Sequence, residues 1–247
     1  MAVIFMSQTL KVVQGENPEG RDGVKTENSV RVVFDLDGTL VDSLGSLAAA
    51  GSRLCTEMDR PTVSAEQYAA FVGRGIMAQV VDLMNSTGGL PDDGGEAAFV
   101  RFKEIYAEDP VSGVDEYPGA RAALGALAEQ GCVLAVCTQK PEVQARQILE
   151  ALDHMPPVSV VVGGDTLPGV LKPDPAMLHR AADPLGTGPL IYVGDSEVDA
   201  KTAENADVPF ILTEWGYRSA APETLRHNAL IRSFAELPET VRRLSQE

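Results

Sequence analysis

The sequence predicts an α/β fold: a Rossmann-like parallel sheet with helices on both faces, interrupted once by a helical insertion. Three observations support this prediction. From Val30 onward, short β-branched runs alternate with helical patterns, which is typical of a parallel sheet. Residues 44–115 break the alternation with helical patterns alone. Polar side chains follow directly after the expected strands, where open parallel sheets bind their ligands.

The expected strands are short apolar runs bounded by polar or glycine-containing segments. They span residues 31–35, 132–137, 158–162, 190–194 and 209–213. Helical patterns of ordinary length accompany the last four strands, at residues 119–130, 141–151, 174–182 and 196–206. Strands and helices that alternate in this way favour crossover connections that cover both faces of one sheet.

The insertion after the first strand contains amphipathic helical patterns and no convincing strand. These patterns lie at residues 46–58, 65–72, 76–84 and 96–107. We therefore expect residues 30–43 and 116–247 to form an α/β core and residues 44–115 to form a helical-bundle cap. Residues 1–29 are rich in glycine and charge over 14–29, so we expect a mobile N-terminal extension.

Composition excludes several classes of partner. The chain has 247 residues, 44% of them hydrophobic, which is enough for one large core and a smaller accessory part. Its net charge of −16 argues against binding to nucleic acid or to an anionic membrane surface. The three cysteines form no CxxC pair, no apolar run reaches 18 residues, and the N-terminus does not resemble a signal peptide. These features predict a cytoplasmic protein.

Two carboxylates stand at the end of the first strand. The apolar run 32–34 leads into Asp35 and Asp37, whose side chains share one face because strand residues i and i+2 point the same way. Such a pair repels unless a cation lies between the carboxylates or one of them holds a proton. The spacing does not fit a calcium loop, since Gly38 comes at the fourth position rather than the sixth. The pair indicates a hard metal ion, a nucleophile with an acid/base partner, or both.

Four further polar residues follow the later strands or precede a helix. Thr138 could bind a phosphate oxygen or cap the next helix, and Lys172 could neutralise a phosphoryl group or be a solvated surface charge. Asp195 and Asp199 could be metal ligands or simple partners of a helix dipole. The histidines have no metal-ligand spacing and there is no Gly-X-Ser-X-Gly motif, so zinc and serine hydrolysis are unsupported.

Together these residues resemble the four motifs of the haloacid dehalogenase superfamily of phosphotransferases. The motifs are Asp35-Leu36-Asp37-Gly38-Thr39, Thr138, Lys172 and Gly194-Asp195-Ser196-Glu197-Val198-Asp199. Within that superfamily the chain is most similar to the phosphoglycolate phosphatases. This finer resemblance rests on segments 71–75, 117–119, 163–168 and 216–218. Gln139 departs from the pattern, because similar enzymes often carry Asn after the threonine.

The resemblance implies a Mg²⁺-dependent phosphomonoester hydrolase that works through an aspartyl-phosphate. Asp35 would be the nucleophile, and Asp37 the general acid that becomes the general base for water. Thr138 and Lys172 would bind the phosphate. The substrate implied is 2-phosphoglycolate, a small phosphorylated metabolite that yields glycolate and phosphate.

The resemblance also assigns the Mg²⁺ ligands. They would be Asp35, the backbone carbonyl of Asp37, and Asp195, while Asp199 nearby would orient water or Lys172. Asp35, Asp37, Asp195 and Asp199 are thus the residues expected at the metal site.

The cap is expected to close over the substrate and read its leaving group. Among the cap's cations, Arg74 lies between Gly73 and Gly75 in a loop, where it could meet a substrate carboxylate. A solvated loop arginine is the competing interpretation.

Three alternative functions remain open from the residues. The first is a related phosphatase for nucleoside monophosphates or sugar phosphates, because selectivity depends on the geometry of the cap. The second is a phosphosugar mutase, which would use the same aspartate pair. The third is a non-catalytic binding domain, which the retention of every chemical residue disfavours.

Overall fold

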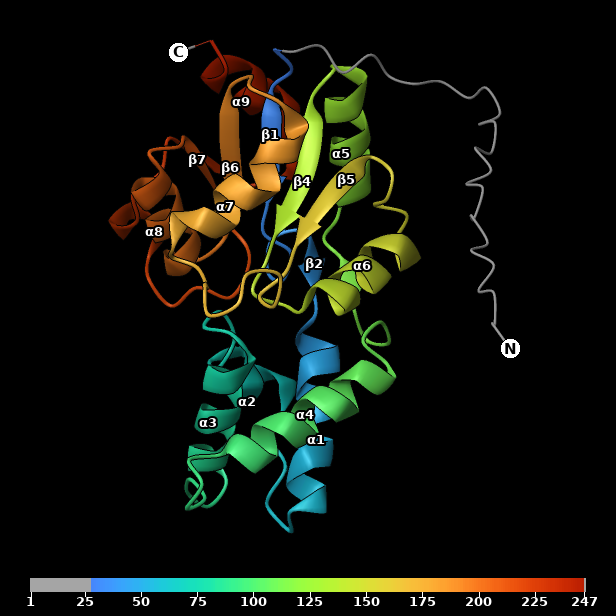
Figure 1. Ribbon diagram of the computed structural model, residues 1–247, viewed down its shortest axis with the longest axis vertical. Coiled ribbons are helices and arrows are strands. Elements are labelled where there is room, and N and C mark those ends of the chain that lie inside the picture. The colour runs from blue at the N-terminus through green and yellow to red at the C-terminus, as the bar shows by residue number, and fades with distance from the viewer. Residues whose placement is uncertain (1–27, 247) are drawn as a thin grey trace, which may run out of the picture.

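Six parallel strands form the central sheet, in the order β5-β4-β1-β6-β7-β8 (Figure 1). This computed structural model describes residues 28–246, so nearly all of the extension expected at residues 1–29 lies outside the described residues. The strands are β1 (Arg31–Phe34), β4 (Val133–Cys137), β5 (Val158–Val162), β6 (Leu190–Gly194), β7 (Phe210–Thr213) and β8 (Ala229–Ile231). β1 lies at the centre, paired with β4 on one side and β6 on the other. The residues that follow these three strands are therefore neighbours at one edge of the sheet.

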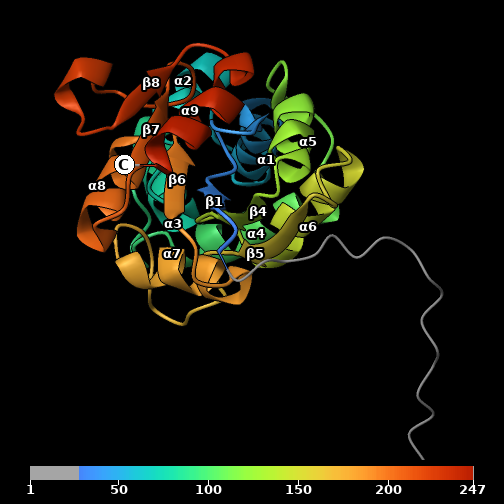
Figure 2. The same cartoon turned by 90° about the horizontal axis from the view of Figure 1, so that it is seen from above.

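Helices cover both faces of the sheet, as Figure 2 shows from above. Successive strand residues point to opposite faces, so Val32 and Phe34 of β1 pack on one side and Val33 on the other. The first face is covered by α5 (Ala120–Glu129), α6 (Glu142–Ala151) and α9 (Leu237–Leu244). The second is covered by α7 (Pro175–Ala182) and α8 (Glu197–Ala206). Short 3₁₀ helices occur at Asp183–Leu185, Pro222–Thr224 and Phe234–Glu236.

The insertion after β1 is helical, and it lies beyond the carboxyl edge of the sheet (Figure 1). Its helices are α1 (Leu44–Glu57), α2 (Ala65–Ala69), α3 (Ile76–Ser86) and α4 (Glu96–Glu108). They enclose a hydrophobic cluster of their own, in which Leu54, Tyr68, Leu83 and Phe102 are fully buried. This cluster stabilises the insertion separately from the two layers that pack on the sheet.

A two-stranded antiparallel ribbon joins the insertion to the sheet-containing part. It pairs β2 (Val41–Asp42) with β3 (Asp115–Glu116). The sequence analysis did not predict this ribbon, nor β8 or α9. Strands of two or three residues are too short to carry a periodic signal. Among residues 28–246, no helix is long and apolar enough to cross a membrane.

Candidate active site

The site begins where β1 ends. Asp35 follows Phe34 directly, and its backbone N–H still donates to Val193 O of β6 at 2.9 Å. The chain then turns at Gly38, which has a φ of 87°, and Gly38 N donates to Val41 O at 2.8 Å. A side chain at Gly38 would be strained in this conformation. The turn therefore leaves Asp35 and Asp37 at the carboxyl edge of the sheet, facing the helical insertion.

Asp195 follows β6 and is held beside this turn. Thr39 Oγ1 donates to Asp195 Oδ1 at 2.9 Å, and the backbone N–H of Tyr217 donates to Oδ2 at 2.9 Å. A Cβ at Gly38 would lie 2.6 Å from Asp195 Oδ2, and one at Gly216 would lie 2.3 Å from it. Both glycines are needed because the buried carboxylate occupies the space that their side chains would take.

Asp199 lies in the first turn of α8, and both of its oxygens accept hydrogen bonds. Oδ2 accepts from Ser196 Oγ at 2.6 Å in a capping box at the start of the helix. Oδ1 accepts from Lys172 Nζ and from the Tyr192 hydroxyl, each at 2.7 Å. Burial favours the neutral acid, but Lys172 and these hydroxyl donors outweigh it and lower the pKa of Asp199. Asp199 is thus an ionised partner that orients Lys172.

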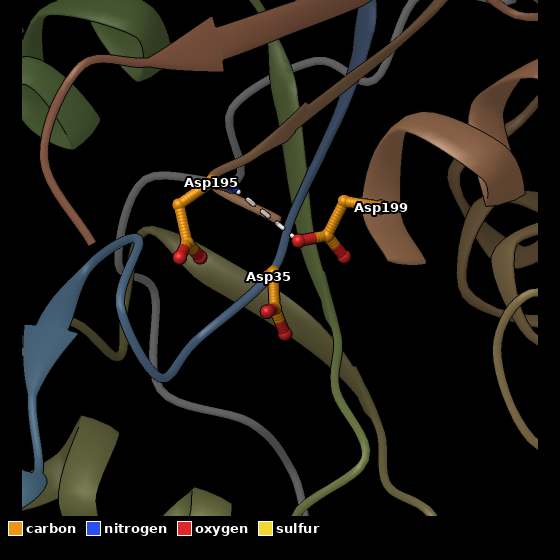
Figure 3. A group of neighbouring side chains, drawn as sticks. All are labelled: Asp35, Asp195 and Asp199. Atoms are coloured by element: carbon orange, nitrogen blue, oxygen red, sulfur yellow. Dashed lines mark hydrogen bonds between the residues drawn. The ribbon is translucent and has the colours of Figure 1, made fainter. Parts of the chain in front are cut away.

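Asp35, Asp195 and Asp199 form one group, with an oxygen of each within 4.8 Å of the others (Figure 3). Burial and the nearby Asp199 raise the pKa of Asp35 to about 7, although Lys172 opposes this shift. Burial and Asp199 also raise the pKa of Asp195 well above its usual range. Asp35 Oδ1 is buried and accepts no hydrogen bond from the described residues, although Lys172 Nζ lies 3.0 Å away. Hard carboxylate oxygens gathered this closely fit a divalent cation.

Asp37 forms an ion pair with a lysine that the sequence analysis did not single out. Lys140 Nζ lies 2.9 Å from Asp37 Oδ1, and Ser43 Oγ donates to the same oxygen at 2.5 Å. Lys140 is buried, and its Nζ lies 4.7 Å from the centre of the Tyr106 ring of α4. Burial lowers its pKa, but Asp37 and Tyr106 outweigh burial, so the pKa is raised and the lysine stays charged. Its place just after β4 is the signal that could have found it.

Thr138 and Lys172 line the same cavity as Asp35. Thr138 is buried at the end of β4, and its Oγ1 accepts from the Lys140 backbone N–H at 3.1 Å. It is not the cap of α6, whose N-cap is Pro141. Lys172 is buried between Asp35 and Asp199, and these carboxylates outweigh the effect of burial and raise its pKa. It is therefore a fixed internal charge and not a solvated one.

Arg74 reaches only the rim. It helps to line an outer cavity of about 320 Å³ that also touches Asp35 and Asp195. Its side chain is 61% exposed, and its guanidinium forms an ion pair with Asp82 of α3. The loop does bring Arg74 to the mouth of the site, but the charge is already engaged by an acidic neighbour.

An inner cavity of about 40 Å³ lies between the two parts of the molecule. The sheet-containing part contributes Asp35, Asp37, Thr138, Gln139, Lys140 and Lys172. The insertion contributes Leu47, Val72, Gly73, Gly75, Ile76 and Gln79. Gln139 Nε2 donates to Gly73 O at 2.8 Å, so the residue that departs from the family pattern connects the two walls.

Comparison with known proteins agrees with this geometry. The family model of haloacid dehalogenase-like hydrolases matches residues 32–213, a range that contains the four aspartates, Thr138 and both lysines of the site. A phosphoglycolate phosphatase of Cereibacter sphaeroides is 41% identical over 214 residues, which cover 86% of this chain and 98% of that protein. One of Rhodospirillum rubrum is 41% identical over 213 residues, covering 83% and 88%.

A solved structure of a predicted phosphoglycolate phosphatase from Haemophilus somnus superimposes with a TM-score of 0.77 at 28% identity, covering 87% of this chain and 98% of that one. The order of the motifs, their meeting at one edge of the sheet and the extent of the match all agree. The chain belongs to the haloacid dehalogenase-like hydrolases.

Proposed function

We propose that this protein is a Mg²⁺-dependent phosphomonoester hydrolase that converts 2-phosphoglycolate to glycolate and phosphate through an aspartyl-phosphate on Asp35. The observation that carries the proposal is the position of Asp35. It lies at the end of the central strand, within 4.8 Å of two other buried carboxylates and 3.0 Å from Lys172, and it lines the cavity under the insertion. A carboxylate beside a cation site and a fixed lysine is suited to attack a phosphate ester.

The metal ion would be held by three groups: the Asp35 carboxylate, the Asp195 carboxylate and the backbone carbonyl of Asp37. Asp199 would not be a ligand and would act on the site indirectly, by orienting Lys172. The closeness of buried Asp35 and Asp195 oxygens supports this assignment. So does the engagement of both Asp199 oxygens by other donors. When bound, Mg²⁺ would supply positive charge that offsets the buried carboxylates and the phosphoryl oxygens.

Each of the remaining residues has a role in the two-step reaction. A carboxylate oxygen of Asp35 forms the bond to phosphorus as the bond to the leaving oxygen breaks, and Asp37 gives that oxygen its proton. Asp37 then takes a proton from the water that attacks the aspartyl-phosphate, which releases phosphate and restores Asp35. Lys172 and Thr138 hold the transferring phosphoryl group. Ser43 and Lys140 fix the direction of Asp37.

The division of the chain follows from these roles. Residues 30–43 and 116–247 would form the catalytic core, and residues 44–115 would form a cap that closes over the substrate and excludes water. The β2–β3 ribbon joins the two parts. The bond from Gln139 to Gly73 O would help to hold them together.

Two observations favour 2-phosphoglycolate over larger esters. The relatives at 41% identity are named phosphoglycolate phosphatases. The inner cavity of about 40 Å³ suits a small leaving group. Arg74 lies at the rim and is paired with Asp82; once this ion pair opens, the arginine would attract the substrate carboxylate. The net charge of −16 would repel the phosphates of a nucleic acid, so the partner would be a small phosphorylated metabolite. The protein would act in the cytoplasm.

The test is a substrate comparison with the purified full-length chain and Mg²⁺. We expect the highest kcat/KM for 2-phosphoglycolate among small phosphomonoesters, with ethyl phosphate, a sugar phosphate and a nucleoside monophosphate as comparisons. Free phosphate should appear in step with glycolate, and a chelator should abolish turnover until Mg²⁺ is restored. Equal kcat/KM values would overturn the substrate assignment. Phosphoryl transfer within a sugar phosphate without free phosphate would indicate a mutase instead.

A further inference from the structure

Gln79 is the one polar side chain that the insertion contributes to the inner cavity, among the residues that the structure describes. It lies in the first turns of α3 and is only 6% exposed. The other residues of the insertion that line this cavity are apolar or glycine. A buried amide costs free energy unless its hydrogen bonds are made, so its place opposite the catalytic carboxylates needs a reason.

The orientation of the Gln79 amide is set from inside the insertion. The Tyr68 hydroxyl donates to Gln79 Oε1 at 3.2 Å and has no other acceptor within residues 28–246. Tyr68 is fully buried, and its ring packs so closely on Gly51 that a Cβ there would lie 2.6 Å from it. Burial raises the pKa of Tyr68, so the hydroxyl keeps its proton and remains a donor. The amide oxygen is therefore held against the interior of the insertion.

The nitrogen of the same amide is left free to donate. Gln79 Nε2 donates to no group in the described part of the chain. On the opposite wall of the cavity, the charge of Lys140 is already balanced by Asp37. The insertion thus presents a neutral, fixed N–H donor to whatever occupies the space between it and Asp37.

We propose that Gln79 Nε2 donates a hydrogen bond to a carboxylate oxygen of the substrate's leaving group, and that Tyr68 is the residue that positions it. This inference rests on the proposed function and names the group on the cap that selects the substrate. A bond to a charged acceptor is stronger than one to a neutral oxygen. A substrate without an acceptor does not gain this hydrogen bond, so the insertion stabilises it less.

The decisive variant is Gln79→Met, which keeps the length of the side chain and removes the donor. The full-length chain with Mg²⁺ is assayed on 2-phosphoglycolate and on ethyl phosphate, which has no carboxylate. We expect kcat/KM for 2-phosphoglycolate to fall about 10- to 100-fold and that for ethyl phosphate to change less than about 3-fold. The matched control is Asn85→Leu, an exposed amide on the same helix, which should leave both values unchanged.

Two further variants sharpen the test. Gln79→Glu places a carboxylate against the substrate carboxylate, so the selective loss should exceed that of Gln79→Met. Tyr68→Phe should reduce the preference for 2-phosphoglycolate by a smaller factor, about 3- to 10-fold, because the amide stays but is no longer oriented. Combined with Gln79→Met, Tyr68→Phe should have no further effect on the preference. If Tyr68 has a purely structural role, Tyr68→Phe should lower kcat/KM for 2-phosphoglycolate and for ethyl phosphate by the same factor.

The outcomes separate this inference from the proposed function. If the native enzyme prefers 2-phosphoglycolate and both Gln79 variants keep the same preference, the role of Gln79 is wrong and the proposed function stands. If the native enzyme does not prefer 2-phosphoglycolate to ethyl phosphate, the substrate assignment is wrong, and the role of Gln79 falls with it. A loss of preference in Gln79→Glu supports the inference even if Gln79→Met does not fold.

Discussion

The two walls of the site differ in how their polar groups are held. On the sheet side, Asp195, Asp199 and Lys172 are all buried, and each contacts at least two other polar groups. On the insertion side, the inner surface is apolar apart from Gln79, and Arg74 is an exposed arginine at the rim.

This difference indicates that the residues for the reaction and the residues for substrate recognition lie on different walls. The charged groups of the sheet wall follow strands whose positions the sheet itself determines, so their geometry is tied to the stability of the fold. The insertion has its own hydrophobic cluster, and side chains on its inner surface can change without disturbing the carboxylates. The sheet wall should therefore determine whether phosphate esters are cleaved, and the insertion should determine which ones.

The largest effect should come from Asp35→Asn on the sheet wall. The change removes the nucleophile and keeps its shape, so we expect kcat to fall by about 10⁴-fold or more on every phosphomonoester. Steady-state assays with 2-phosphoglycolate and an aryl phosphate measure this. The Tm should not fall, because the variant removes a charge from a crowded group of buried carboxylates. Near-native turnover of any substrate would contradict the covalent mechanism.

A smaller effect is expected for Lys140→Met, because Lys140 touches both walls through Asp37 and Tyr106. Loss of the ammonium leaves Asp37 with Ser43 as its remaining partner, so proton transfer should slow by about 10- to 100-fold for all substrates alike. The matched control is Lys103→Met, because Lys103 is an exposed lysine that lies over the Phe99 ring of α4, the helix that also carries Tyr106. A loss confined to 2-phosphoglycolate would show that Lys140 recognises the leaving group instead.

The insertion wall is tested at its rim by Arg74→Ala. Because Arg74 is exposed and paired with Asp82, we expect the kcat/KM preference for 2-phosphoglycolate over an aryl phosphate to fall only about 3-fold. Turnover of the aryl phosphate should stay close to native. Asp82→Asn releases the arginine and should increase the preference by a similar factor. If neither variant changes the ratio, Arg74 has no part in recognition.

The smallest effect concerns the loop at the mouth of the site. Glu197 Oε1 accepts from Ser219 N at 3.0 Å, Ser219 Oγ at 2.9 Å and Ala220 N at 2.6 Å. Burial raises the pKa of Glu197, but these donors outweigh it, so the folded pKa lies below the ordinary 4.5. A depressed pKa stabilises the fold above pH 4.5, and this stability is lost as pH falls through the folded pKa.

The corresponding variant is Glu197→Gln, measured by thermal unfolding from pH 7 to pH 3. Its Tm should be slightly below the native value at pH 7, and the gap should narrow below pH 4.5. Glu223→Gln, on an exposed position of the same loop region, is the control and should show no gap. A gap that widens on acidification would contradict the assigned pKa direction.

Much of the fold follows from local sequence pattern. β5 and β6 span the predicted 158–162 and 190–194, and α5, α6, α7 and α8 begin within one residue of the expected positions. Buried strands of this kind are continuous apolar runs and are visible without any partner. The ribbon of β2 and β3 was missed because two-residue strands exist only through their pairing with each other.

The site also contains features that local sequence predicts and features that only the fold creates. The positions of Asp35, Thr138 and Asp195 at the edge of the sheet could be predicted because each follows a parallel strand directly, and a strand end is a local feature with a known place in the sheet. Lys172 lies ahead of α7 and follows no strand directly, so its contact with Asp35 and Asp199 is visible only in the structure. The salt bridge of Lys140 to Asp37 could not be predicted either, because it requires β4 to lie beside β1.

The sequence by itself determined the α/β sheet, its helical insertion and the polar residues that follow the strands, since apolar periodicity and turn residues act over a few neighbours. Only the tertiary structure decided which of those groups are partners. Tyr68 donates a hydrogen bond to the Gln79 amide oxygen, and Asp82 forms an ion pair with Arg74 at the rim. The physical reason such contacts escape sequence reasoning is that burial and side-chain direction are properties of the assembled structure.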